Sequence, residues 1–438
     1  MQYSNDILIY VSGLNSRVHF VFRHVFIKLL GLRPVITNDK DAFIEYKGAK
    51  INYTQHRIEG LLYIKPDGLL YDKGVKELKI KTGVYKGVPV LFVNNEESDF
   101  YFDVFSAIFY MITRYEEYLP FNTDKFKRFQ PQCSIAFDNK FIEEPIVEIW
   151  ANLFKDYLKE QFPDTEFKQP NQFAYLATID IDAAYAYRYH NPIQTLASFA
   201  RELVTFQWKS FANRFFAILR LSNDPFDNFE YLKQCLQNYK TRPIFFFLSG
   251  ERGRYDKNNP VNLAVMKQTI NYVDLFAEVG IHPSFASNYK IKTLHKEKVA
   301  LEASLGKTVT KSRQHYIILN FPKTYQNLSK IEISEDYSLG YAAASGFRAG
   351  TCTPFNFFDL SLNKETELHV IPFQAMDTTF KTYLKLSPQE AEVKLIELYH
   401  KIKKVNGIFA VIWHNETLPN TTEGQQWRQV FENMLKLT

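Results

Sequence analysis

Cysteine and net charge are both scarce in this sequence of 438 residues. The three cysteines, Cys133, Cys235 and Cys352, are far apart and have no spacing typical of a metal or redox motif. Such a count fits thiols that pack as small apolar residues in a reducing compartment. Lys and Arg number 53 against 48 Asp and Glu, so the chain lacks the basic surface that nucleic-acid binding requires.

Long apolar runs are missing as well. Bursts such as residues 244–248 are far shorter than the roughly 20 residues of a membrane-spanning helix. Residues 1–13 lack the basic start and the long apolar segment of a secretory signal. We therefore expect a soluble, cytoplasmic protein with no transmembrane segment. The aromatic and basic stretch 198–221 leaves peripheral membrane contact open, although its cations do not gather on one helical face.

Several catalytic signatures are also absent. No G-x-S-x-G elbow occurs and no cysteine follows a pattern that pairs it with a base, which argues against a serine or cysteine hydrolase. None of the 17 glycines belongs to a phosphate-binding motif, which argues against dinucleotide and P-loop binding.

Aromatic side chains, in contrast, are plentiful. They make up 16% of a chain that is otherwise ordinary for a globular protein, with 46% hydrophobic and 23% charged residues. Aromatic rings fill cores and also stack on flat ligands or sugar rings, so composition alone leaves their role open. The length fits two or three domains of roughly 150 residues each.

Residues 1–170 are predicted to form a smaller mixed α/β domain. The polar, proline-containing stretch 163–172 follows a helix and marks its boundary. Strands or β-like pieces are expected at 7–11, 34–37, 42–46, 51–54, 61–64 and 89–93. Helices are expected from Asn15 or Ser16 to Leu30 and over 103–118 and 145–162.

Residues 171–438 alternate between strand and helix patterns, which predicts a parallel α/β barrel or a doubly wound sheet. Strands are expected at 173–181, 243–248, 281, 310–319, 367–373 and 408–413. Helices are expected over 192–221, after Asp227, and at 261–279, 290–305, 388–403 and from Glu423.

Two carboxylates close the first of these strands. Asp180 and Asp182 project on the same face, because side-chain direction alternates along a strand. Two such charges repel each other unless a cation or a shared proton relieves them, although solvation in a loop would also suffice. The two carboxylates therefore form either a functional site that holds a cation or a proton, or an ordinary strand end followed by a helix cap.

Histidines follow other predicted strands. His282 precedes a proline, His414 comes directly after a buried strand, and Arg313 and His315 share a face if their segment is extended. A lone histidine is more often structural than catalytic. These residues nevertheless share one position, the carboxyl end of a strand, and that is where α/β folds place their active sites.

The order of these motifs resembles that of the polysaccharide deacetylases, the carbohydrate esterase family 4 or NodB-homology enzymes. The resemblance covers about residues 173–420 and rests on four elements. These are Asp-x-Asp at 180–182, His-Pro-Ser at 282–284, an Arg after the helix end 306–309, and apolar-Trp-His at 412–414. It implies a deformed (β/α) barrel and a hydrolase that acts on carbon–nitrogen bonds other than peptide bonds.

The resemblance also implies roles for single residues. Asp180 would be the general base and Asp182 a metal ligand. His282 would be the first histidine of the metal motif. Arg313 would brace the base, and His414 would protonate the leaving amine. A divalent metal, most typically zinc, would complete the site.

The chain departs from the family at one metal ligand. The family has a second histidine four residues after the first, but Ala286 follows His282 at that distance. His315 is the best replacement, because catalytic zinc usually has three protein ligands and one open position. If His315 does not replace it, the metal is weakly held or absent.

Other segments look like features of a divergent branch of this family. The first 170 residues look like the accessory domain of that branch, and 114–118 is the most recognisable segment of this domain. The similar segments are 336–338, 346–351 and 372–377. The predicted substrate-binding residues are Arg348, Asp377 and Tyr185. Arg348 would clamp a carboxylate or phosphate, or pair structurally with an aspartate, and Tyr185 would stack on a sugar or simply pack.

Two functions remain open from the sequence. The first is a metal-dependent hydrolase that removes an N- or O-acetyl group from a glycan or sugar precursor. The second is a degenerate, non-catalytic carbohydrate-binding or polysaccharide-assembly protein, which Ala286 favours. The sequence does not indicate which glycan is involved or what the oligomeric state is.

Overall fold

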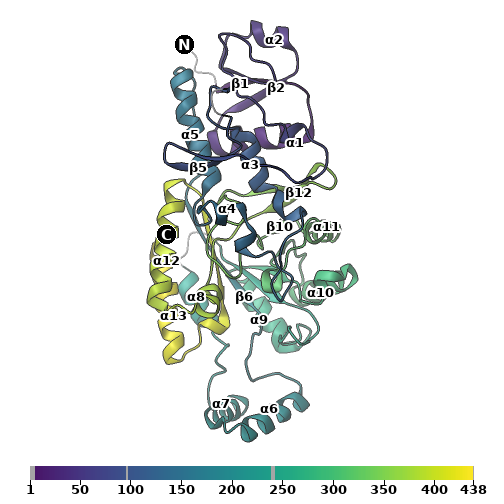
Figure 1. Cartoon of the computed structure of the whole chain (residues 1–438). Helices are drawn as coiled ribbons and strands as arrows, with labels where there is room; N and C mark the ends of the chain where they lie inside the picture. The colour runs from purple at the N-terminus through teal and green to yellow at the C-terminus, as the bar shows by residue number, and fades with distance from the viewer. Residues whose placement is uncertain (1–4, 95–96, 238–241, 438) are drawn as a thin grey trace.

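Three sheets, of three, two and nine strands, organise the chain in the computed structural model, which describes residues 5–94, 97–237 and 242–437. The two-stranded sheet is an antiparallel hairpin over residues 82–91. A small N-terminal sheet lies at one end of the molecule, a large sheet occupies the middle, and a pair of helices projects at the opposite end (Figure 1). No helix in these three ranges is long and apolar enough to cross a membrane. Residues 1–4 of the N-terminal stretch fall outside them.

The N-terminal sheet is parallel, with β1 between β2 and β3. A long helix follows β1 as predicted, because the Asn15 side chain accepts the Val18 N–H at 3.0 Å and Gly31 ends the helix at φ 68°. The strands are β1 Asp6–Val11, β2 Arg33–Thr37, β3 Lys50–Tyr53, β4 Thr82–Tyr85 and β5 Val88–Leu91. The helices are α1 Ser16–Phe22 with its continuation Arg23–Leu30, α2 Lys40–Glu45, α3 Val104–Ile112, α4 Ile135–Asp138 and α5 Ile146–Gln161.

Three local predictions in this part are wrong. Of the β-like piece at 61–64, only Tyr63 pairs, in an isolated bridge with Asn52. The β-like piece at 42–46 is helical, because the Asp39 side chain caps α2 by accepting the N–H groups of Asp41 and Ala42. The helix predicted over 103–118 ends at Ile112. Arg114 takes a left-handed conformation at φ 53°, and a separate 3-10 turn follows it.

The large sheet has nine strands in the order β11-β12-β10-β9-β8-β7-β6-β14-β13, all parallel except for the β11–β12 pair. Its central strands are buried apolar runs, as expected for a sheet with both faces covered. The strands are β6 Ala174–Ile181, β7 Ile244–Leu248, β8 Glu278–His282, β9 Lys311–Ser312, β10 Glu335–Asp336, β11 Phe355–Asp359, β12 Lys364–Val370, β13 Ala375–Met376 and β14 Ile408–His414.

The mixed α/β class and a large, mostly parallel sheet are thus confirmed. Among the described residues no pairing joins the edge strands β11 and β13, so closure into a barrel stays a prediction. The division near residue 170 also stays a prediction. The helices of this part are α6 Pro192–Val204, α7 Trp208–Ile218, α8 Phe229–Leu236, α9 Ala264–Asp274, α10 Ile291–Leu305, α11 Lys323–Lys330, α12 Pro388–Lys404 and α13 Thr422–Lys436.

Several boundaries differ from the predictions. The strand expected over 367–373 is β12, which begins at Lys364 and ends at Val370. The helix expected over 192–221 breaks between Val204 and Trp208 into α6 and α7. The helix expected over 261–279 ends at Asp274, because the chain already enters β8 at Glu278. Of the strand expected over 310–319, only Lys311–Ser312 pairs, and a tight turn follows at His315–Ile317.

A buried charge network ties the turn after α3 to the segment before β11. One Glu117 carboxylate oxygen accepts hydrogen bonds from Nε of Arg114 at 2.7 Å and Nε of Arg348 at 2.9 Å, and all three residues are buried. Burial opposes the charge on Glu117, but the two guanidinium groups outweigh it and lower the pKa of this carboxyl. Arg348 is therefore part of the scaffold.

Replacing one member of this network should destabilise the fold. For Arg348→Met we expect the free energy of unfolding, measured with urea, to fall by about 3–5 kcal/mol, because Glu117 loses a buried partner. The matched control is Lys296→Met, which breaks an exposed ion pair with Glu251 and should change little. Unchanged stability of Arg348→Met together with weaker substrate binding would instead support the clamp role.

Candidate functional site

The carboxyl ends of β6, β8 and β14 open into a cavity of about 410 Å³, which is in the usual range for a ligand pocket. Asp180 of β6 and His414 of β14 are register partners in neighbouring strands. His282 ends β8, and His315 lies in the turn that follows β9. The parallel sheet therefore brings four of the predicted side chains to one cavity.

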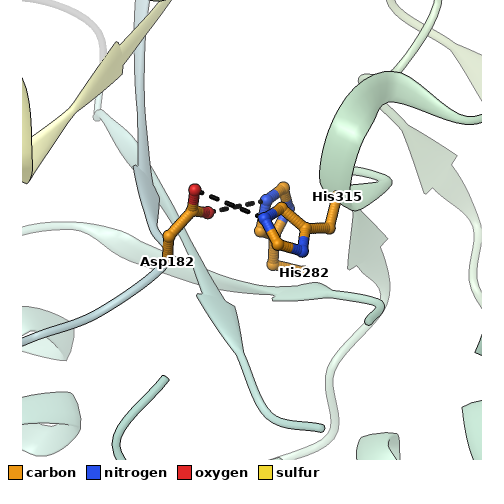
Figure 2. Close-up of side chains that lie close together, drawn as sticks. All are labelled: Asp182, His282 and His315. Atoms are coloured by element: carbon orange, nitrogen blue, oxygen red, sulfur yellow. Dashed lines mark ion pairs between the residues drawn. The ribbon is translucent and has the colours of Figure 1, made fainter. Parts of the chain in front are cut away.

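Asp182, His282 and His315 face one another across this cavity (Figure 2). Nε2 of His282 lies 3.1 Å from Oδ1 of Asp182, and Nε2 of His315 lies 3.4 Å from Oδ2. One ligand atom from each residue falls within 4.8 Å of the other two. Ligands of a tetrahedral zinc ion lie roughly 3.3–3.6 Å apart, so this geometry fits a metal with little adjustment.

Both imidazoles are held by their other nitrogen. Nδ1 of His282 lies 2.5 Å from the backbone oxygen of Arg313, and Nδ1 of His315 lies 2.9 Å from Oδ1 of Asp256. Metal-ligating histidines usually make such a bond on the far side of the ring, which fixes the tautomer and orients the free nitrogen. Here the bonds direct both Nε2 atoms toward Asp182.

The cluster is also strongly coupled in charge. Burial opposes ionisation of Asp182, but His315 and His282 outweigh it and lower the pKa of this carboxyl well below its usual value. Burial likewise opposes a charged His315, but Asp182 and Asp256 raise the pKa of the ring to about 9. A cation bound among these residues would supply to Asp182 the positive charge that the neighbouring histidine rings supply here.

Asp180 is fully buried and has one carboxylate oxygen without a hydrogen-bond partner among the described residues. Its Oδ1 has no partner among the described residues, and its Oδ2 lies 3.8 Å from Nη1 of Arg313 and 3.9 Å from Nε2 of His282. Buried polar groups are nearly always satisfied, so this carboxylate is available to a water molecule or ligand in the cavity.

Arg313 is held beneath Asp180. Its Nη2 donates to Oγ1 of Thr178 at 2.8 Å, and its guanidinium lies over the rings of Phe246 and Phe373 at 5.1 and 5.4 Å. Because the group is buried and fixed, its positive charge stabilises the negative charge of Asp180.

His414 is paired with Asp377, which sequence motifs had suggested as a substrate-binding residue. Nδ1 of His414 lies 2.6 Å from Oδ1 of Asp377, and the backbone N–H of His414 donates to Oδ2 at 2.7 Å. Burial opposes the charged ring, but Asp377 raises the pKa of His414 to about 10. Asp377 therefore holds His414 in its protonated form.

The other two predicted substrate-binding residues lie in different places. Tyr185 lines the cavity, and its hydroxyl is 2.8 Å from Oγ1 of Thr269. Arg348 does not line the cavity and contacts Glu117 in the interior. The structure thus brings Tyr185 to the site and leaves Arg348 apart from it.

Two acidic residues of the site were missed from the sequence. Asp256 lies in the loop after β7 and supports His315, whereas Glu416 follows β14 and lines the cavity. Burial and the nearby Asp182 raise the pKa of Glu416 to about 7. Their position after a strand is the signal that could have identified them, although many loop carboxylates share it.

Aromatic and basic side chains form the walls of the cavity. Tyr255, Tyr316 and Tyr383 line it together with Arg128 and Arg252. Tyr316 and Ile317 both have left-handed backbones, at φ 60° and 56°, which is costly for residues of this size. This strained turn places His315 and Tyr316 at the cavity.

One family model matches the first part of the chain. Residues 7–163 match the model of a family of unknown function, DUF7033. No curated protein matches the chain.

Several solved structures match part of the chain. A chain described as a polysaccharide deacetylase from Mycobacterium smegmatis is 12% identical with a TM-score of 0.41, covering 62% of this chain and 86% of that one. A mutant CE4 family pseudoenzyme with restored enzymatic activity is 10% identical with a TM-score of 0.30, covering 61% and 64%. A polysaccharide deacetylase from Bacillus cereus is 11% identical with a TM-score of 0.29, covering 60% and 87%. At this level of similarity, the chemistry of the site has to be inferred from the side chains of this chain.

Removing the charge of Asp377 should lower the pKa of His414. In Asp377→Asn we expect the ring, followed by NMR, to titrate about 1–3 units below the value of about 10, because the neutral amide no longer stabilises the imidazolium. His414 would then lose its proton at lower pH. The exposed His295 serves as an internal reference, and a titration that stays near pH 10 would contradict the assignment.

Proposed function

We propose that this protein is a metal-dependent hydrolase that removes an acetyl group from a nitrogen or oxygen of a carbohydrate. One observation carries the proposal. Asp182 and the Nε2 atoms of His282 and His315 lie at ligand distances, while Asp180 and His414 border the same cavity. This is the set of groups that acyl hydrolysis needs: a metal site, a base and an acid.

The residues present fit a divalent metal. Two imidazoles and one carboxylate are a donor set typical of catalytic zinc, and both rings are already oriented by Arg313 and Asp256. His315 thereby takes the place of the histidine that the family motif has where this chain has Ala286. A divalent ion held there would supply Lewis acidity, which activates water and polarises an acyl carbonyl.

Asp180 would act as the general base. Its carboxylate lines the cavity and has one oxygen without a hydrogen-bond partner among the described residues, so it is a candidate to accept the proton of an attacking water. Arg313 does not reach the cavity itself. Its guanidinium is fixed by contacts with Thr178 and two phenylalanine rings, and its positive charge stabilises the negative charge of Asp180.

His414 would act as the general acid. Asp377 keeps the ring protonated at neutral pH and fixes its orientation through Nδ1, which leaves Nε2 as the donor. A departing amine needs a proton before the carbon–nitrogen bond can break, so a charged imidazole on the edge of the cavity suits an amide substrate.

The walls favour a sugar ring. Tyr255, Tyr316 and Tyr383 present flat, amphipathic surfaces along a cavity large enough for a small ligand or for one or two sugar units. Arg128 and Arg252 add hydrogen-bond donors for hydroxyl or anionic groups.

Metal binding should depend on His315. We expect the purified protein to bind one Zn²⁺ per chain by elemental analysis, and His315→Ala and Asp182→Ala to lose it because each removes one of three ligands. Asp256→Asn should weaken binding about 10–100-fold in a competition titration, since it only orients a ligand. His295→Ala, on the exposed face of α10, is the matched control, and equal metal content in His315→Ala would contradict the site.

The role of His414 should show in the choice of leaving group. We expect His414→Ala to slow acetate release from N-acetylated sugar oligomers by about 10²–10⁴-fold, with little effect on 4-nitrophenyl acetate, whose leaving group needs no proton. Asp180→Asn should slow both reactions while metal is retained. If the metal-loaded protein released no acetate from N- or O-acetylated sugars, the enzyme proposal would be overturned in favour of carbohydrate binding.

A further inference from the structure

The helices α6 and α7 form an arm, residues 189–221, that projects from the molecule at the end opposite the N-terminal sheet (Figure 1). Nearly half of the exposed large apolar side chains of the described residues lie on this arm. They are Tyr189, Ile193, Leu196, Leu203, Val204, Phe206, Trp208, Phe215, Phe216, Ile218, Leu219 and Leu221.

Each helix of the arm has an apolar face that the other helix covers only in part. The two helices contact each other through Phe199 and Phe211, whose ring centroids are 4.9 Å apart. Exposed apolar residues recur at helical spacing beside these two rings: Ile193, Leu196 and Leu203 on α6, and Trp208 and Phe215 on α7, followed by Leu219 at its end. Amphipathic helices normally bury such a face, so it implies a surface that covers it.

The turn between the helices is the most apolar part of the arm. Val204, Phe206 and Trp208 are 77%, 76% and 58% exposed. Trp208 is the exposed one of four tryptophans, because Trp150 and Trp413 are fully buried and Trp427 is 1% exposed. Aromatic side chains at a projecting tip are typical of proteins that insert into the interface of a bilayer.

The charge of the arm is positive on its outer surface. Arg201, Lys209 and Arg220 are exposed and make no ion pair among the described residues. The single acidic residue of the arm, Glu202, is buried and paired with Arg214 at 2.8 Å. Free cations therefore border the apolar faces, with no exposed acid to oppose them.

The base of the arm is fixed to the wall of the cavity. The Asp224 carboxylate accepts the backbone N–H groups of Ala186, Tyr187 and Arg188, and the Arg188 side chain donates to the backbone oxygens of Ala217 and Ser222. Ala186 also lines the cavity. The arm thus extends directly from the segment that forms one side of the site.

We propose that the arm docks the protein on the surface of a membrane that contains anionic lipids. The apolar faces and the aromatic tip enter the interface, while the free cations contact the phosphate groups. A second copy of the chain fits this surface less well, because a symmetric contact would bring two sets of unpaired cations, and no exposed acid of the arm, into one interface.

Docking in this way holds one wall of the cavity near the bilayer. The interaction is peripheral, since neither arm helix can span a membrane. It depends only on the arm and does not require the proposed hydrolysis, so binding and activity can fail separately.

The test uses the full chain and vesicles of phosphatidylcholine with or without about one third phosphatidylglycerol. We expect cosedimentation with the anionic vesicles and a blue shift of Trp208 emission, both weakened by salt. Recovery of the wild-type protein in the supernatant with both kinds of vesicle at low salt would overturn the proposal.

Variants separate the two contributions. Phe206→Ser with Trp208→Ser should reduce vesicle partition at least tenfold, because two aromatic anchors are lost. Replacing Arg201, Lys209 and Arg220 by Gln should weaken binding to anionic vesicles about fivefold per cation. Leu275→Ser with Leu362→Ser, equally exposed but outside the arm, is the control.

Circular dichroism checks that each variant folds, and light scattering measures its mass without lipid. Arm variants that bind vesicles as well as the wild-type protein would overturn the proposal. So would a wild-type dimer that becomes monomeric in the Phe206→Ser, Trp208→Ser variant, because a second copy would then cover the arm.

Discussion

The candidate site depends on the parallel pairing of the central strands. Parallel strands present all their carboxyl ends at one edge of a sheet, so the residues that follow them meet even when they are far apart in the sequence. Asp180 and His414 are 234 positions apart by number and become register partners across β6 and β14. The β7–β8–β9 order then brings His282 and the turn that carries His315 to the same edge.

Three buried carboxylates are paired with cationic or imidazole groups. Glu117 lies between two arginines, Asp377 holds His414, and Asp256 holds His315. Each carboxylate thereby offsets the free-energy cost of its burial. Asp180 is different, because its Oδ1 has no hydrogen-bond partner among the described residues. A group that the fold leaves unsatisfied inside a cavity is where a ligand or water has the most to contribute.

The arm is the second place where the fold leaves groups without a partner, because its apolar side chains are exposed. Elsewhere the abundant aromatic residues mainly fill the apolar core, as in the ring contacts of Phe22, Tyr53 and Phe105. On the arm the same residue types face outward beside unpaired cations. Aromatic side chains therefore occur in three settings: the core, the wall of the cavity and the exposed surface of the arm.

The sequence by itself determined which residues close the central strands. Apolar runs and the period of two placed Asp180, Asp182, His282 and His414 at strand ends, because these signals are local. It could not show that His315 turns toward Asp182, since this depends on two left-handed residues and on Asp256, 59 positions away. Likewise, the sequence predicted one continuous helix over 192–221, on which the cations did not gather on one face. The structure has a break between Val204 and Trp208, so each of the two helices has its own apolar face. Tertiary structure also decided that Arg348 meets Glu117, because a contact across 231 positions follows from packing that no local pattern encodes.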